Sequence, residues 1–223
     1  LRPLGLRLRP SDNPLIVHIA DTASVYGPCA GAFAMKDWHQ ALVDTFDVLR
    51  GKGCKNNNGV VEKQVHGYDT WERESLKNEE NPAPQYNLTE KKILRKYVGG
   101  DECDTEIAFE GRLVGGCMDC LVNLTGTSFD KVKEFNERYA ADGIVWFLES
   151  CDLNVFAIRR AMWQMDNAGW FKNVKGFLIG RPLCYGQEMM GLDQYRAVTG
   201  IAAKYNVPVI MDCDFGHLSR RAK

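Results

Sequence analysis

The sequence predicts an α/β fold in which a mixed, partly parallel sheet is flanked by helices. From residue 106 onward, short apolar stretches typical of buried strands alternate with longer stretches of helical spacing. The chain has 223 residues, of which 45% are hydrophobic, so it can bury the core of one domain and part of a second. Both observations exclude a disordered or collagen-like chain.

The first hundred residues are expected to hold two helices and then a polar stretch. Cap-forming side chains and a proline before an apolar run predict a helix over residues 14–23. Helical spacing of apolar residues predicts an amphipathic helix over residues 35–49, which the glycines at 51 and 53 end. Residues 52–105 are polar and rich in turn-forming sequence, and are interpreted as an excursion with a few exposed strands.

The sheet is expected to come from the C-terminal half of the chain. Apolar runs predict strands over residues 107–109, 112–114, 144–148, 175–179 and 207–211. Stretches of helical spacing between them predict helices over residues 117–124, 154–166 and 192–205.

Composition excludes two classes of protein. The chain carries 28 Lys and Arg against 29 Asp and Glu, a net charge of −1, whereas a nucleic-acid binder usually shows a basic excess. No apolar run approaches the about 18 residues that a membrane span needs. The eight cysteines are interpreted as mostly reduced thiols of a cytoplasmic protein, since a chain with this many aromatic and aliphatic residues needs no disulfide scaffold.

Two predicted strands end at ionisable side chains. Residues 144–148 lead directly to Glu149, and residues 207–211 lead through two aspartates to His217. Because ligands of α/β sheets bind at the carboxyl ends of strands, Glu149 and His217 are candidate acid–base partners. The alternative is that Glu149 caps the following helix and His217 is an ordinary turn residue.

Ser11 is a candidate nucleophile at the start of the first predicted helix. The backbone N–H of Asp12 could donate to a developing oxyanion there, and the helix dipole favours negative charge. The alternative is that Ser11 only caps the helix. A base and an orienting carboxylate would be needed to make it a catalytic serine.

Cys117 and Cys120 form a C-x-x-C pair on a predicted short helix. A single pair without a second pair or a nearby histidine is weak support for zinc binding. We interpret both as small packing residues, with a thiol or zinc module as the alternative. His18, on the apolar face of the first predicted helix, is expected to be a core residue.

Taken together, short motifs along the chain resemble the LD-carboxypeptidase family of serine peptidases, family S66. This family includes muramoyltetrapeptide carboxypeptidase and the microcin C immunity peptidases. The resemblance is carried by residues 11–13 (SDN), 19–28 (IADTASVYGP), 115–116 (GG), 124–127 (LTGT), 144–149 (IVWFLE), 158–160 (IRR) with Gln164, and 215–217 (FGH). These motifs occur in family-like order over most of the chain.

The resemblance implies a catalytic triad of Ser11 as nucleophile, His217 as general base and Glu149 as the carboxylate that orients the imidazole. It also implies that the backbone N–H of Asp12 is an oxyanion donor. It implies a cytoplasmic hydrolase without metal or cofactor that cleaves an L,D-peptide bond in murein-derived tetrapeptides during cell-wall peptide recycling. The alternatives are a peptidyl-nucleotide immunity peptidase and a non-catalytic binding remnant. The expected partner is a small peptide, not nucleic acid or a membrane, and a homodimer stays open.

The sequence departs from the family at both ends. Arg9 and Pro10 stand where members usually carry Gly-Tyr, and Pro14 replaces the usual Thr. Members also have a whole N-terminal α/β domain before the nucleophile and further strands after the Gly-His. We therefore expect a truncated chain with little activity by itself. Its expected organisation is a remnant of the N-terminal domain over residues 1–50, a polar excursion over 51–105 and an incomplete C-terminal domain over 106–223.

Overall fold

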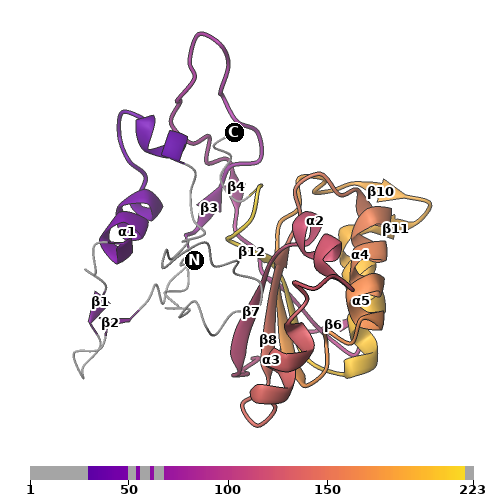
Figure 1. The fold of residues 1–223 in the computed structure, drawn as a ribbon. Coiled ribbons are helices and arrows are strands. Elements are labelled where there is room, and N and C mark those ends of the chain that lie inside the picture. Colours follow the sequence, from indigo (N-terminus) through magenta and orange to yellow (C-terminus); the bar gives the residue numbers. More distant parts are fainter. Residues whose placement is uncertain (1–29, 50–53, 56–60, 63–67, 219–223) are drawn as a thin grey trace. The chain divides into compact units, whose positions relative to one another are not determined.

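A computed structural model describes residues 30–49, 54–55, 61–62 and 68–218 (Figure 1). The chain divides into two compact units, and the described residues up to Lys92 belong to the first and those from Ile93 to Leu218 to the second. The predicted helix over residues 14–23, with Ser11, Asp12 and His18, lies outside the described residues. Among the described residues, no helix is long and apolar enough to cross a membrane.

The first unit contains short elements around a small core. They are η2 (Ala30–Ala34), α1 (Gln40–Leu49), β1 (Cys54–Lys55), β2 (Val61–Glu62), β3 (Thr70–Trp71) and β4 (Glu90–Lys91). The predicted helix over 35–49 begins later than expected, at Gln40, because the Trp38 indole donates to the Phe33 carbonyl at 3.0 Å and holds the preceding residues in a bend. The His39 ring accepts the Ala41 N–H at 3.1 Å and so satisfies one of the free donors of the first helical turn.

The second unit is built on a mixed six-stranded sheet, which confirms the predicted α/β fold class. Its strands, in spatial order, are β6 (Asp101–Glu102), β5 (Arg95–Val98), β12 (Val209–Cys213), β9 (Val174–Gly180), β8 (Ile144–Glu149) and β7 (Arg112–Cys117). β12, β9, β8 and β7 pair in parallel, whereas β5 pairs antiparallel with β12 and β6 antiparallel with β5. The central parallel strands therefore end at one edge of the sheet.

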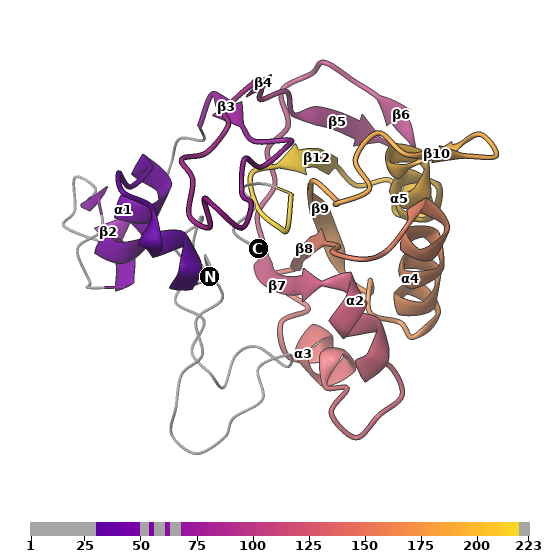
Figure 2. The same cartoon turned by 90° about the horizontal axis from the view of Figure 1, so that it is seen from above.

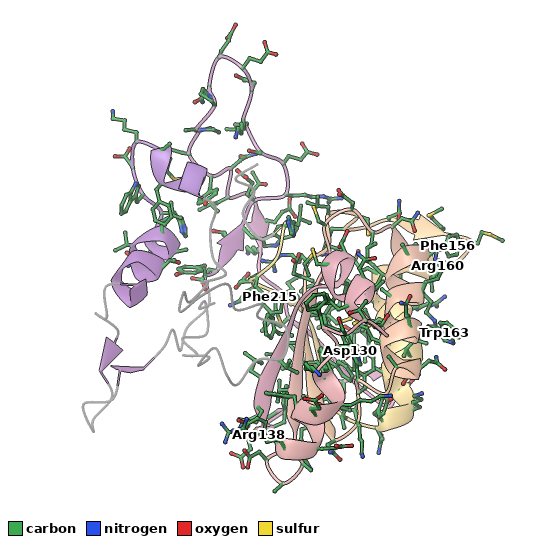
Figure 3. The ribbon with its side chains drawn as sticks, viewed as in Figure 1. Asp130, Arg138, Phe156, Arg160, Trp163 and Phe215 are labelled. Atoms are coloured by element: carbon green, nitrogen blue, oxygen red, sulfur yellow. The ribbon has the colours of Figure 1, made fainter. Side chains whose placement is uncertain are left out.

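Helices cover the sheet and enclose the main core. They are α2 (Met118–Leu121), η3 (Val122–Leu124), α3 (Val132–Arg138), α4 (Val155–Asn167), α5 (Gln194–Ala202) and η4 (Ala203–Tyr205). Figures 1 and 2 show α4 and α5 side by side along one face of the sheet. Phe156, Arg160 and Trp163 lie on the side of α4 that points away from the sheet (Figure 3). The fully buried Trp146 stacks on Trp170 beneath the helices, with ring centroids 5.7 Å apart.

Side-chain caps set where the two longest helices of the second unit begin. The Asn154 side chain accepts the Ala157 N–H at 2.9 Å at the start of α4. The Asp193 side chain does the same for the Arg196 N–H at 2.7 Å at the start of α5. The predicted helix over 192–205 therefore begins at Gln194, because the two residues before it form β11 (Leu192–Asp193) in a hairpin with β10 (Glu188–Met189).

Two further expectations differ from the structure. Residues 107–109 form no strand, and Phe109 instead lays its ring against Gly176 of β9, where a Cβ atom would come within 2.6 Å of it. Conversely, β5 belongs to the main sheet, although the polar sequence of residues 52–105 predicted an excursion with a few exposed strands. Its Tyr97 is buried and pairs with Val209, so partners far along the chain, rather than local pattern, decide its place.

Candidate active site

Glu149 and His217 meet although 68 residues separate them. The His217 Nδ1 lies 2.7 Å from the Glu149 Oε2, and the His217 backbone N–H donates to the same oxygen at 3.2 Å. The Glu149 side chain is fully buried, whereas the His217 side chain is 41% exposed. The structure thus brings together two of the residues predicted for the site, one enclosed and the other open to solvent.

Strand β8 delivers Glu149 into the interior of the sheet. All six of its residues are buried, and it pairs in parallel with β7 on one side and β9 on the other. Glu149 is the last residue of the strand and lies opposite Cys117 of β7 in the register. An unbroken apolar run is what a central parallel strand requires, and its carboxyl end is where ligands of such sheets bind.

Two glycines allow the chain after β12 to approach Glu149. Gly216 has φ of 100°, and a Cβ atom there would come within 2.8 Å of the Glu149 Cβ. A Cβ atom on Gly180, at the end of β9, would come within 2.3 Å of the Phe215 carbonyl oxygen. Phe215 packs edge-on against Phe147, with ring centroids 6.0 Å apart (Figure 3). Side chains larger than hydrogen at 180 and 216 would therefore push His217 away from its carboxylate.

A buried arginine fixes the turn that leads to His217. The Arg181 side chain is 1% exposed, and its guanidinium donates to the Asp212 carbonyl and forms an ion pair with Asp214. Asp212 has φ of 64° and lies where the register of β12 against β9 shifts between Ile210 and Cys213. Such an irregularity redirects a strand, and here it turns the chain toward Glu149.

The Asp212 side chain is buried. Burial raises its pKa, although the Tyr195 hydroxyl, which donates to it at 2.9 Å, and the nearby Arg181 oppose that rise. Burial likewise raises the pKa of Tyr195. Asp212 therefore supports the strand end through hydrogen bonds and does not face His217 in any described contact.

Asp119 connects α2 to the segment just after Glu149. Its Oδ2 accepts the Cys151 N–H at 2.9 Å, and its Oδ1 accepts the Asp152 N–H at 2.8 Å. Burial alone would raise the pKa of Asp119, but the backbone donors of Cys151 and Asp152, with the Cys117 thiol, outweigh it and lower that pKa. The interpretation from sequence missed Asp119 and Arg181, because their partners lie more than thirty residues away in the chain.

The lowered pKa of Asp119 predicts a loss of stability in acid. A carboxyl whose pKa is lower folded than unfolded stabilises the fold above its unfolded pKa, about 3.9, and that stabilisation is lost as pH falls through the folded pKa. We expect Asp119→Asn to lower the free energy of unfolding by about 1–3 kcal/mol at pH 7. The difference from wild type should shrink below about pH 4 in urea titrations; a constant difference from pH 7 to pH 3 would contradict this assignment.

Cys117 belongs to the site rather than only to the core, whereas Cys120 is exposed. The Cys117 thiol donates to the Asp119 Oδ2 at 3.3 Å and lies beside Glu149. Burial, and next the negative charge of Glu149, raise the pKa of Cys117, so the thiol keeps its proton at neutral pH and is a poor nucleophile. The six cysteines whose side chains are described are all free thiols.

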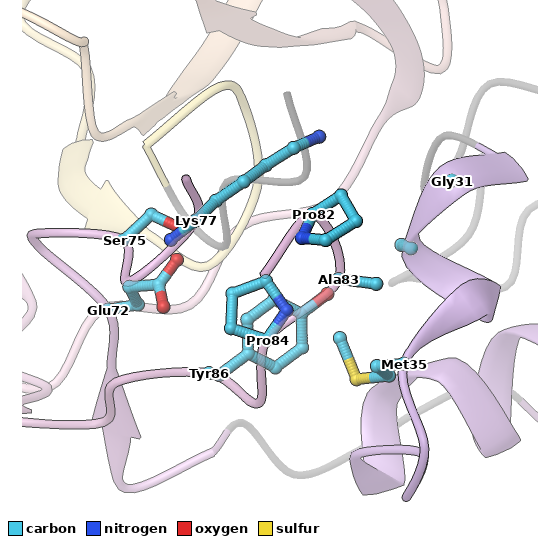
Figure 4. Close-up of a pocket in the computed structure, with 10 residues that line it drawn as sticks. Gly31, Met35, Glu72, Ser75, Lys77, Pro82, Ala83, Pro84 and Tyr86 are labelled. Carbon is cyan, nitrogen blue, oxygen red and sulfur yellow. The ribbon is translucent and has the colours of Figure 1, made fainter. Parts of the chain in front are cut away.

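A separate shallow hollow lies in the first unit (Figure 4). Met35, Pro82 and Tyr86 line it together with the buried Glu72. The Glu72 Oε2 accepts the Asn87 N–H at 2.7 Å and so joins the two ends of the loop between β3 and β4. Neither Glu149 nor His217 is among the described residues that line this hollow.

A protein-family comparison matches the half of the chain that carries Glu149 and His217. The matching family model is described as the LD-carboxypeptidase C-terminal domain and covers residues 110–222. The comparison with curated protein sequences gives no match.

Solved structures to which this chain is similar include three named proteins. The microcin C7 self immunity protein MccF, as an inactive mutant in the apo state, has a TM-score of 0.56 at 16% identity and covers 80% of this chain and 47% of its own. An MccF-like protein from Streptococcus pneumoniae in complex with AMP has a TM-score of 0.52 at 15% identity, covering 82% and 52%. A muramoyltetrapeptide carboxypeptidase from Oxalobacter formigenes has a TM-score of 0.42 at 22% identity, covering 58% and 42%. This chain therefore spans about half the length of the solved structures that it matches.

Proposed function

The chain belongs to the LD-carboxypeptidase family of serine peptidases, and from this membership we propose that it hydrolyses an L,D-peptide bond in a murein-derived tetrapeptide and releases the terminal D-alanine. The observation that supports this proposal is the contact of the buried Glu149 with His217 at 2.7 Å. We further propose a cytoplasmic role in recycling cell-wall peptides, in line with the family resemblance.

In the proposed mechanism, His217 accepts and donates protons, and the Glu149 carboxylate stabilises the positive charge of the imidazolium that forms in between. The Glu149 carboxylate accepts from the Nδ1 side of the ring, which leaves the Nε2 free to take the hydroxyl proton of Ser11 as that oxygen attacks the substrate carbonyl. His217 then gives the proton to the leaving amine of D-alanine, and a water molecule repeats the two steps to release the acyl group.

The burial of Glu149 favours this division of roles. A carboxylate shielded from water interacts more strongly with an imidazolium than an exposed one does, because the effective dielectric constant is lower. The exposed side of His217 leaves room for a substrate beside the ring. The roles of Ser11 as nucleophile and of the Asp12 N–H as oxyanion donor come from the family resemblance, since both residues lie outside the described part of the chain.

Release of D-alanine tests the proposal directly. The protein is incubated for a long period with a murein tetrapeptide, because the sequence predicts a slow rate, and free D-alanine is measured. We expect release by the wild type, and a loss of at least about 10³-fold in His217→Asn. His39→Asn, which changes a histidine that accepts a backbone N–H in the first unit, is the matched control and should keep the wild-type rate. Equal release by wild type and His217→Asn would overturn the proposal.

The second candidate substrate is an amino acid joined to a nucleotide. Two of the solved structures with a TM-score above 0.5 are MccF with glutamyl sulfamoyl guanosine and an MccF-like protein with AMP. The same pair of Glu149 and His217 could serve that reaction. Hydrolysis of an aminoacyl sulfamoyl nucleoside without release of D-alanine from the tetrapeptide would favour this candidate. Hydrolysis of neither substrate would favour a non-catalytic binding role.

A further inference from the structure

We propose that Cys117, Glu149 and His217 form a binding site for a thiophilic divalent cation such as Zn²⁺. The three residues come from the ends of β7 and β8 and from the turn after β12. One ligand atom from each, the Cys117 Sγ, a Glu149 carboxylate oxygen and a His217 ring nitrogen, lies within 4.8 Å of the other two. Thiolate, carboxylate and imidazole are the three side-chain ligands that zinc takes in proteins.

The spacing of these atoms suits a tetrahedral ion. Bonds of about 2.0–2.3 Å to nitrogen, oxygen and sulfur place neighbouring ligand atoms about 3.3–3.8 Å apart. The upper limit of 4.8 Å exceeds that range by about 1 Å, whereas the Glu149 Oε2 and the His217 Nδ1 are in direct contact at 2.7 Å. Rotations about side-chain bonds must therefore close the first gap and open the second, so the ion replaces the hydrogen bond between Glu149 and His217. Three protein ligands leave a fourth position, and the 41% exposed His217 side chain gives an ion access from solvent.

The residues around the cluster hold two of its ligands in place. Asp119 holds the segment that follows Glu149 through the N–H groups of Cys151 and Asp152, whereas its hydrogen bond from the Cys117 thiol is lost when that thiol gives up its proton to bind the ion. The His217 backbone N–H is bound to the Glu149 carboxylate. A cation therefore meets ligands whose backbones are already ordered, which lowers the entropic cost of binding.

Charge and protons balance when the ion binds. The Cys117 thiol loses its proton to solvent and binds as a thiolate, Glu149 binds as a carboxylate, and His217 binds through a ring nitrogen that carries no proton. The imidazole keeps its single N–H on the nitrogen that does not face the ion. The thiolate and the carboxylate neutralise the dication, so the ion and its three ligands together carry no net charge.

This cation site shares Glu149 and His217 with the proposed peptidase function, so a bound ion would block hydrolysis. An ion that occupies Glu149 and His217 prevents the imidazole from exchanging protons. The experiment that tests the cation site measures binding by spectroscopy and does not depend on hydrolysis. A failure of the cation proposal therefore leaves the peptidase proposal standing, and the reverse also holds.

Cobalt titration of the full chain tests the site, because Co²⁺ replaces Zn²⁺ and reports thiolate ligation by a near-ultraviolet charge-transfer band. We expect one band in the wild type that Zn²⁺ removes by competition. The band should disappear in Cys117→Ser, and the affinity should fall at least about 100-fold in Cys117→Ser and His217→Asn. Cys120→Ser, a neighbouring thiol outside the cluster, is the matched control and should bind as the wild type does.

Several outcomes would overturn the proposal. They are a wild type without a charge-transfer band, a band that persists in Cys117→Ser, and a band that Cys120→Ser removes while His217→Asn keeps it. The last outcome would place the ion on the C-x-x-C pair instead. Far-ultraviolet circular dichroism of each variant confirms that the fold is intact. If Cys117→Ser does not fold, then carbamidomethylation of the native thiols, with and without Zn²⁺, replaces it, and protection of Cys117 is the expected result.

Discussion

Glu149→Gln should lower kcat for release of D-alanine by about 10⁴-fold and leave KM nearly unchanged. A neutral amide cannot stabilise the imidazolium that forms when His217 takes up a proton. Its NH₂ group can also turn toward the His217 Nδ1 and favour the wrong tautomer, with the proton on Nε2. Rates for wild type and variant at saturating tetrapeptide measure the effect, and the variant should keep its thermal unfolding temperature within a few degrees.

The control for this experiment is Glu134→Gln, which makes the same chemical change at a residue of α3 that forms an exposed ion pair with Lys131, just before the helix. Surface ion pairs of this kind contribute little, so this variant should match the wild type in both rate and stability. If Glu149→Gln keeps more than a tenth of the wild-type kcat, the carboxylate does not support the imidazolium, and His217 would then act without it.

Asp214→Ala is expected to lower the free energy of unfolding by about 3 kcal/mol, the largest stability effect that we predict at the site. The change removes the carboxylate that faces the buried Arg181 guanidinium. Arg181 keeps its hydrogen bond to the Asp212 carbonyl, so the cost falls at the lower end of the range for a broken buried pair. Urea unfolding of both proteins at pH 7 and low salt measures the difference.

A double variant separates the buried charge from the packing around it. Arg181→Met with Asp214→Leu replaces the ion pair by apolar side chains, and such replacements are often neutral. We expect the double variant to recover most of the stability that Asp214→Ala loses. If it is instead less stable than Asp214→Ala, the hydrogen bond from Arg181 to the Asp212 carbonyl contributes more than the ion pair does.

The apolar runs predicted the parallel part of the sheet for physical reasons, and they made Glu149 and His217 candidate partners at strand ends. Buried parallel strands need unbroken apolar runs, and the runs before Glu149 and His217 end where the structure ends β8 and β12, within two residues. The place of these two residues at strand ends then brought them to one edge of the sheet. Ser11 and Asp12 stay predictions, because they lie outside the described residues.

Other features depended on contacts that local pattern does not encode. β5 has a short run with two charged residues, and only its pairing with β12 places it in the sheet. From the sequence, Arg181 is expected to be a solvent-exposed cation after a strand. It is buried in the structure because its guanidinium donates to the Asp212 carbonyl and forms an ion pair with Asp214. From the sequence, Asp119 is expected to be an ordinary acidic residue in the first turn of a helix. In each case the deciding partner is distant in sequence.

The double attachment of His217 to one oxygen of Glu149 limits the path that a proton can take. The backbone N–H and the ring side of Nδ1 are both directed to that oxygen, so the imidazole has one orientation and a single nitrogen that faces outward. The ring therefore takes up and releases each proton through that one outward-facing nitrogen. In the proposed mechanism, the departing nitrogen of a substrate would therefore have to reach the same ring nitrogen that took the proton from the attacking hydroxyl.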